Sequence, residues 1–170
     1  MRLIRRSRLN RNRVGVEGGH RGGVEIEALY TAEATATGAG REGRTRSSDG
    51  ALDETLTVPA ELGGAGGSGT NPEQLFAAGY AACFHNAVKL TARRLRLSAT
   101  DSSVTARIGI GRRPEGGFAL KAELVVRLPE LTREEAEAVV EKADSVCPYS
   151  NAIRDNVEVK LTVREAPDVI

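Results

Sequence analysis

The pattern of apolar and polar positions divides the chain into strands and helices in the order β-β-β-α-β-β-α-β. From Val24 to about Gly38 apolar side chains alternate with polar ones, which predicts a half-exposed strand. The segment GAGREG (38–43) predicts a turn. Residues 45–58 supply one or two further strands, broken at Asp49-Gly50, a dipeptide typical of hairpins.

The spacing of apolar residues changes after the glycine-rich segment LGGAGGSGT (62–70), which predicts a loop. Asn71 or Thr70 can cap a helix there, and Pro72 suits the first helical position because its missing N–H is not needed. From Pro72 to about Arg94 the sequence is apolar on almost all sides. This predicts a long helix buried in the interior, with Cys83 at its middle.

Two alternating segments in the second half of the chain predict a β-hairpin. They cover residues 104–110 and 118–128, and the segment 114–117 turns the chain between them. A third alternation, over 157–163, predicts the last strand. We expect the strands of this region to form antiparallel sheets.

A second helix is predicted between the hairpin and the last strand. Thr132 and Glu135 form the sequence of a capping box at its start. It must end at Cys147, because the residue before Pro148 is excluded from the α conformation. The whole order predicts an α+β fold, with antiparallel sheets packed around a long buried helix in a single domain over 24–170.

Charge separates the N-terminal segment from the rest of the chain. The 170 residues have a net charge of +1, but residues 1–21 hold seven arginines and one acid, Glu17, so the remainder carries 1 − 6 = −5. This acidic remainder argues against nucleic acid as a partner, and no apolar stretch approaches the roughly 18 residues of a membrane span. We expect residues 1–23 to be a basic, disordered extension. Because they lack the apolar region of a signal peptide, we also expect a cytoplasmic location.

Two common kinds of site have weak support. The glycine-rich loop is not followed by Lys-Ser/Thr and contains no GxGxxG within a parallel βαβ unit, so a phosphate site is disfavoured. His20 and His85 do not share a metal-ligand spacing with the two cysteines. We therefore expect no metal and no bound cofactor.

Cys83 and Cys147, 64 residues apart, hold the remaining candidate chemistry. Buried cysteines are often inert, and this interpretation stays open. A reactive thiolate needs a nearby cation, so an arginine from elsewhere has to reach Cys83. Cys147, at a helix C-terminus, stays protonated. Such an unequal pair suits attack by Cys83 on an oxidant and capture of the sulfenic acid by Cys147.

Three segments resemble the organic hydroperoxide resistance (Ohr) branch of the OsmC superfamily. They are LYTAEATATGAGREGRTRSSDG (29–50), ELGGAGGSGTNPEQLFAAGYAACFHNAVKL (61–90) and VCPYSNAIRDN (146–156). The resemblance covers about residues 25–163, and CPYSNA is similar to the Ohr branch rather than the OsmC branch. It implies an OsmC-like fold and an intertwined homodimer with sites at the interface. It also implies a thiol peroxidase, without haem, metal or flavin, that reduces organic hydroperoxides in oxidative-stress defence.

The same resemblance implies the role of each site residue. Cys83 matches the peroxidatic thiol and Cys147 the resolving one, while Arg41 of GREGR matches the arginine that stabilises the thiolate. Glu73 of NPEQ matches the carboxylate that orients this arginine. The implied reductant is an external dithiol, a lipoyl group on a protein of the 2-oxoacid dehydrogenase type. A redox sensor with the same cysteine pair, a structural dimer with inert thiols, and an OsmC-like peroxidase with broader peroxide preference remain alternatives.

The spacing of Glu73 and Cys83 sets a geometric problem. Ten residues on a straight helix place them about 15 Å apart along the axis, too far for one arginine that is paired with Glu73 to reach both. We therefore predict either that the helix breaks near Gly79, or that Arg41 and Glu73 reach Cys83 from the other subunit.

Overall fold

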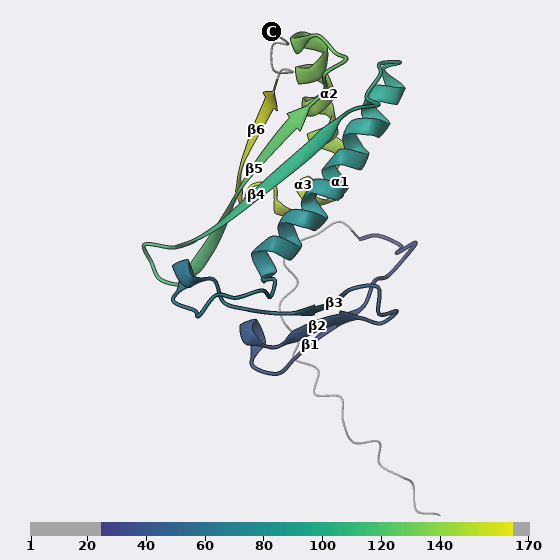
Figure 1. Ribbon diagram of the computed structural model, residues 1–170. Helices are drawn as coiled ribbons and strands as arrows, with labels where there is room; N and C mark the ends of the chain where they lie inside the picture. Colours follow the sequence, from purple (N-terminus) through teal and green to yellow (C-terminus); the bar gives the residue numbers. More distant parts are fainter. Residues whose placement is uncertain (1–24, 165–170) are drawn as a thin grey trace, which may run out of the picture. The chain divides into compact units, whose positions relative to one another are not determined.

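The computed structural model describes residues 25–164 (Figure 1). They fall into two units, residues 25–32 and 33–164. The basic extension predicted for residues 1–23 lies outside this range. Residues 25–32 contain neither helix nor strand, and the side chains of Ile26, Leu29 and Tyr30 are exposed. The strand predicted from Val24 is therefore wrong over this part. Alternation alone does not make a strand, because the backbone also needs a partner to pair with.

The first sheet consists of β1 (Ala34–Thr37), β2 (Arg44–Ser47) and β3 (Asp53–Thr55), antiparallel in the order β1-β2-β3. The predicted break at Asp49-Gly50 is confirmed, since the chain turns there between β2 and β3, and the N–H of Gly50 donates to the carbonyl of Ser47 at 3.0 Å. The GAGREG segment turns between β1 and β2 and includes a short 3-10 helix at Gly40–Glu42.

Helix α1 (Pro72–Arg94) has the predicted bounds and runs unbroken. Asn71 caps it by accepting the N–H of Gln74 at 2.9 Å, and Pro72 occupies the first turn. Only one face is buried, through Tyr80, Phe84, Ala87, Val88, Thr91 and Ala92. The interior position predicted for the whole helix is thus not reached within this chain, where Ala78 and Ala82 are exposed on the remaining surface.

The second sheet contains β4 (Ser103–Arg112), β5 (Phe118–Arg127) and β6 (Glu158–Arg164), in the order β4-β5-β6. The hairpin of β4 and β5 is antiparallel, as predicted, with Ile108 opposite Ala122. The expectation of purely antiparallel sheets is wrong for β6, which pairs with β5 in parallel. The reason is the helical crossover between β5 and β6, which returns the chain to the end of the sheet where β5 began.

Two helices form that crossover. Helix α2 (Arg133–Val146) opens with the predicted capping box, in which the Thr132 side chain accepts the N–H of Glu135 and the Glu135 carboxylate accepts the N–H of Thr132. Its last residue is Val146 and Cys147 is its C-cap, so the end predicted at Cys147 is confirmed. The six-residue helix α3 (Pro148–Ile153) was not predicted, although Pro148 is well suited to its first position.

The core lies where the buried face of α1 meets the second sheet and α2 (Figure 1). Its largest fully buried side chains are Tyr80, Phe84, Leu124, Val88, Val126, Val139 and Cys147. Burying a leucine or phenylalanine side chain of this kind contributes about 1.5–3 kcal/mol. Across residues 25–164, no helix has both the length and the apolar content to cross a membrane.

Candidate redox site

The two cysteines lie together in the fold. The thiol of Cys147 donates to the sulfur of Cys83, with the sulfur atoms 3.7 Å apart. Cys83 is half-buried on α1, whereas Cys147 is fully buried. The pairing of the two thiols that the sequence suggested is therefore present in the reduced chain.

Cys147 occupies the corner between α2 and α3, and its backbone is held from both sides. Its N–H donates to the carbonyl of Ala143 at 2.9 Å, and its carbonyl accepts the N–H of Asn151 at 3.0 Å. Pro148 forces the corner by removing Cys147 from the α conformation, and Cys147 has φ −70° and ψ 122°. The position of this sulfur is thus set by two helix ends.

The surroundings of Cys83 in this chain favour the neutral thiol. Burial raises the pKa of Cys83 above its ordinary value, a hydrogen bond from the backbone N–H of Tyr149 opposes the rise, and the Cys147 thiol adds to it. No cation from residues 25–164 contributes to this pKa. The Tyr149 N–H was not found from the sequence, because a backbone donor on an unpredicted helix leaves no signal in residue type.

Aromatic rings pack beside the thiols. The Tyr149 ring is nearly parallel to that of Phe76, with centroids 6.1 Å apart and an interplanar angle of 12°, and it also contacts Tyr80. Tyr80 meets Phe84 edge to face. The hydroxyl groups of Tyr80 and Ser150, both buried, lie 2.9 Å apart. These contacts attach α3 to the face of α1 that also carries Cys83.

Arg41 and Glu73 form a second pair. Arg41 lies on the short 3-10 helix before Gly43, and its guanidinium binds both carboxylate oxygens of Glu73 in the first turn of α1. The hydrogen bonds from Arg41 lower the pKa of the Glu73 carboxyl, against the effect of its partial burial. The turn requires glycine at position 43, since a Cβ atom there would lie 1.9 Å from the carbonyl oxygen of Thr37.

The structure therefore groups the four predicted site residues as two pairs. Because α1 is continuous through Gly79, the predicted break at that residue is wrong. Ten helical residues keep Glu73 and Cys83 about 15 Å apart along the axis. The other predicted solution, a contribution from a second subunit, stays a prediction.

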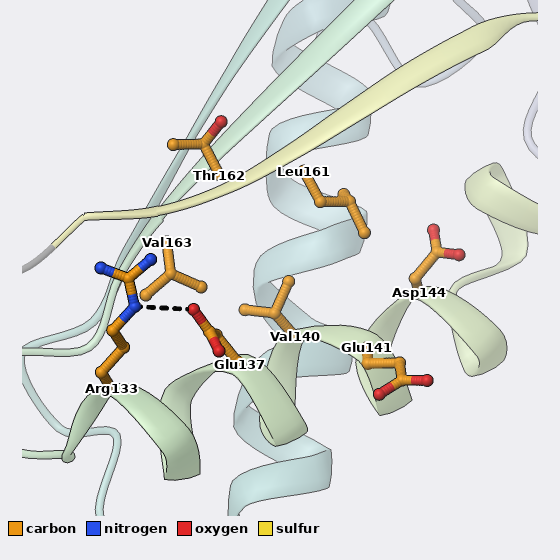
Figure 2. Close-up of a pocket in the computed structure, with 8 residues that line it drawn as sticks. All are labelled: Arg133, Glu137, Val140, Glu141, Asp144, Leu161, Thr162 and Val163. Atoms are coloured by element: carbon orange, nitrogen blue, oxygen red, sulfur yellow. Dashed lines mark hydrogen bonds and ion pairs between the residues drawn. The ribbon is translucent and has the colours of Figure 1, made fainter.

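Two grooves lie near these elements. One, of about 430 Å³, runs beside Glu73 and is lined mainly by apolar side chains, among them Leu62, Ala77, Ile108 and Ile110. The other, of about 470 Å³, lies between α2 and β6, where Leu161 and Val163 point toward α2 and Thr162 points away (Figure 2). None of the four site residues lines this second groove.

No cluster of three or more histidine, cysteine or acidic side chains suited to a metal ion occurs among residues 25–164. His85 instead lies 3.0 Å from the hydroxyl oxygen of Ser102, which donates to the carbonyl of Ala99 at 2.7 Å. The imidazole therefore acts as the donor to this hydroxyl and connects α1 to the start of β4.

Comparison with known proteins gives the same assignment for sequence and fold. Residues 64–162 match the family model described as OsmC-like protein. The chain is 55% identical, over 138 residues, to the organic hydroperoxide resistance protein of Xanthomonas axonopodis, covering 81% of this chain and 96% of that protein. The solved structure of an organic hydroperoxide resistance protein from Legionella pneumophila is 51% identical with a TM-score of 0.76, covering 81% of this chain and 98% of that one. OhrB of Bacillus subtilis is 44% identical with a TM-score of 0.75, covering 81% and 100%. The chain thus belongs to the OsmC-like family and, within it, to the organic hydroperoxide resistance branch.

Proposed function

We propose that this protein is a cysteine-based peroxidase that reduces organic hydroperoxides to alcohols and serves in oxidative-stress defence. The observation that carries the proposal is the pair of thiols 3.7 Å apart on the fold of this family. Cys83 is partly accessible and Cys147 is fully buried. This difference suits a sulfur that reacts with the substrate and a second sulfur that reacts only with the first. The names of the relatives supply the substrate class.

The reaction has three steps. The Cys83 thiolate attacks the distal oxygen of the hydroperoxide, the O–O bond breaks, and the alkoxide takes a proton to leave as the alcohol. The Cys147 sulfur then attacks the Cys83 sulfenic acid, so that an S–S bond forms, the S–O bond breaks and water leaves. An external dithiol is oxidised to its disulfide and returns both thiols to the reduced state.

The first step needs a thiolate, and the surroundings of Cys83 within one chain favour the neutral thiol instead. Burial raises the Cys83 pKa, and Arg41 is bound to Glu73 about 15 Å away along α1. We propose that a second copy of the chain brings its Arg41–Glu73 pair to Cys83, so that the catalytic unit is an intertwined homodimer. The exposed alanines of α1 and the exposed Ile26, Leu29 and Tyr30 are apolar surface that such a dimer would cover.

We also propose that the groove beside Glu73 accepts the alkyl or lipid chain of the substrate, because its lining is largely apolar. The proposed reductant is a lipoyl group on a protein, with no cofactor bound to the enzyme itself. A thiol pair that must be reduced again after each turnover suits a reducing compartment, and we propose the cytoplasm.

The test mixes reduced protein with one equivalent of cumene hydroperoxide or of hydrogen peroxide and follows thiol loss and intact mass. Dihydrolipoamide is then added to measure turnover. We expect rapid loss of both thiols with the organic peroxide, slower loss with hydrogen peroxide, a mass lower by two hydrogen atoms, and repeated cycles with the dithiol.

Each alternative gives a different result in this assay. If the thiols react with the peroxide only after the protein is unfolded, the result would support a structural dimer with inert thiols. Oxidation that occurs once and is not reversed by dihydrolipoamide would favour a redox sensor. Equal rates with both peroxides would favour the broader OsmC-like preference.

A further inference from the structure

We propose that Gly79 is a positioning residue for disulfide formation. By leaving space on α1 for the ring of Tyr149, it holds the corner that carries Cys147 against Cys83. Its role in turnover rests on the proposed peroxidase function, but its effect on the distance between the two thiols does not.

The fit between Gly79 and Tyr149 is close. A Cβ atom at position 79 would lie 3.2 Å from the hydroxyl oxygen of Tyr149 and 3.3 Å from Cε2 of its ring. Contacts this short require the ring to move by a few tenths of an ångström. The backbone at position 79 does not require glycine, because the residue lies inside a continuous α-helix. In a helix interior glycine is less favourable than alanine by about 1 kcal/mol.

The Tyr149 ring is close to the thiols in both helix geometry and chain connectivity. Gly79 precedes Cys83 by four residues, so the two lie on the same face of α1, one turn apart. Cys147 comes two residues before Tyr149. A displaced ring would therefore disturb the corner that places the Cys147 sulfur.

Contacts on two sides of α3 oppose a movement of the helix as a whole. On one side the hydroxyl groups of Tyr80 and Ser150 lie 2.9 Å apart. On the other side the guanidinium of Arg154 donates to the carbonyl oxygen and to a carboxylate oxygen of Asp144, both at 3.0 Å. We infer that part of the adjustment falls on residues 147–149, because the Tyr149 ring belongs to the segment that carries the reacting sulfur of Cys147.

Disulfide formation depends strongly on this placement. The sulfur atoms must close from 3.7 Å to the bonded distance of about 2.05 Å as the Cys83 sulfenic acid loses its oxygen as water. Misplacing reacting groups by about 1 Å lowers rates by about 100-fold, so a shift of a few tenths of an ångström should slow this step by about 3- to 10-fold.

The first experiment uses no peroxide. Reduced protein is equilibrated with mixtures of reduced and oxidised glutathione. The fraction of disulfide gives the effective concentration of the Cys83 and Cys147 thiols relative to each other, which is compared for wild type, Gly79→Ala and Gly111→Ala. Gly111 is the control because a Cβ atom there would have no neighbour within 4 Å. We expect the effective concentration to fall by about 3- to 10-fold in Gly79→Ala, the same range as for the rate of disulfide formation. We expect no change in the Gly111→Ala control.

The second experiment adds cumene hydroperoxide. We expect Gly79→Ala to slow disulfide formation and to increase the sulfinic acid of Cys83, seen as the gain of two oxygen atoms. In a Cys147→Ser background, where no disulfide forms, Gly79→Ala should leave the rate of Cys83 oxidation unchanged. A general structural defect would slow both steps.

Tyr149→Ala completes the test. With the ring removed, adding Gly79→Ala should cause no further loss of effective concentration, whereas equal losses in both backgrounds would overturn the proposal. An unchanged glutathione equilibrium in Gly79→Ala alone would also overturn it. If wild type does not react with hydroperoxide but Gly79→Ala still lowers the effective concentration, the peroxidase function fails and the positioning role stands.

Discussion

The thiol of Cys147 donates to the sulfur of Cys83 at 3.7 Å, although 64 residues separate them in sequence. Subtracting a bonded S–S length of about 2.05 Å leaves about 1.7 Å to close. Cys147 is held at two helix ends, so rotation of the Cys83 side chain on α1 is the movement that the structure leaves for this closure.

The pair predicts different products for its two serine variants. In Cys147→Ser the Cys83 sulfenic acid has no resolving thiol, so it should accumulate and proceed to the sulfinic acid with excess hydroperoxide. In Cys83→Ser the thiol of Cys147, which is fully buried, should not react. Intact mass after a few equivalents of cumene hydroperoxide distinguishes these products. Oxidation of Cys147 in the Cys83→Ser variant would reverse the assigned roles.

Replacing Arg41 should weaken the activation of Cys83. We expect Arg41→Met to lower the rate of reaction with organic hydroperoxide by about 100-fold, because the thiolate loses a fixed cation and donor. The pH at which Cys83 becomes reactive toward iodoacetamide should rise, since burial alone raises the Cys83 pKa. Arg44→Met is the matched control, because Arg44 is an exposed neighbour paired with Asp53 instead. An unchanged pH profile in Arg41→Met would remove Arg41 from the site.

Glu73→Gln tests the ion pair through its dependence on pH. Arg41 lowers the pKa of Glu73 in the folded chain, so the pair stabilises the fold at pH values above the ordinary carboxyl pKa of about 4.3. That contribution is lost as the pH falls through the lowered pKa of the folded state. Urea unfolding of Glu73→Gln should therefore show a smaller loss of stability on acidification than wild type does. Glu137→Gln, which affects an exposed ion pair on α2, should follow the wild-type curve.

The proposed homodimer is tested by placing a charge on the exposed surface of α1. Ala78→Arg should shift the protein from dimer to monomer in sedimentation and lower its activity, because the site then lacks the partner's Arg41. Ala138→Arg makes the same change at an exposed alanine of α2 and should leave the dimer intact. A dimeric and fully active Ala78→Arg protein would show that this face of α1 is not the interface.

Local signals account for the parts of the fold that could be predicted. Asn71-Pro72 and the capping box of Thr132 and Glu135 fixed the helix starts, because they satisfy backbone donors that each first turn leaves free. The parallel pairing of β6 follows from the helical connection between β5 and β6 and not from the residue pattern of the strand. Helix α3 is too short for a helical periodicity to show in the sequence. The strand predicted over residues 25–32 is wrong for another reason. Alternating apolar and polar residues form a strand only when a partner strand is present.

The site was predictable to a different degree at each residue. Cysteine chemistry alone singled out Cys83 and Cys147 and left open whether they react. The resemblance supplied Arg41 and Glu73, whose pairing the structure contains. The donor at Tyr149 and the contact at Gly79 belong to the packing of α3 on α1, which no single-residue pattern encodes.

The unequal burial of the two sulfur atoms also determines how a disulfide between them would be opened. A reductant arriving from solution can reach only the sulfur on α1, because Cys147 has no exposed surface. The mixed disulfide would therefore form at Cys83, with Cys147 as the leaving group. The fold thus determines which sulfur the proposed reductant attacks, and a protein reductant would need to approach only the side of α1 that carries Cys83.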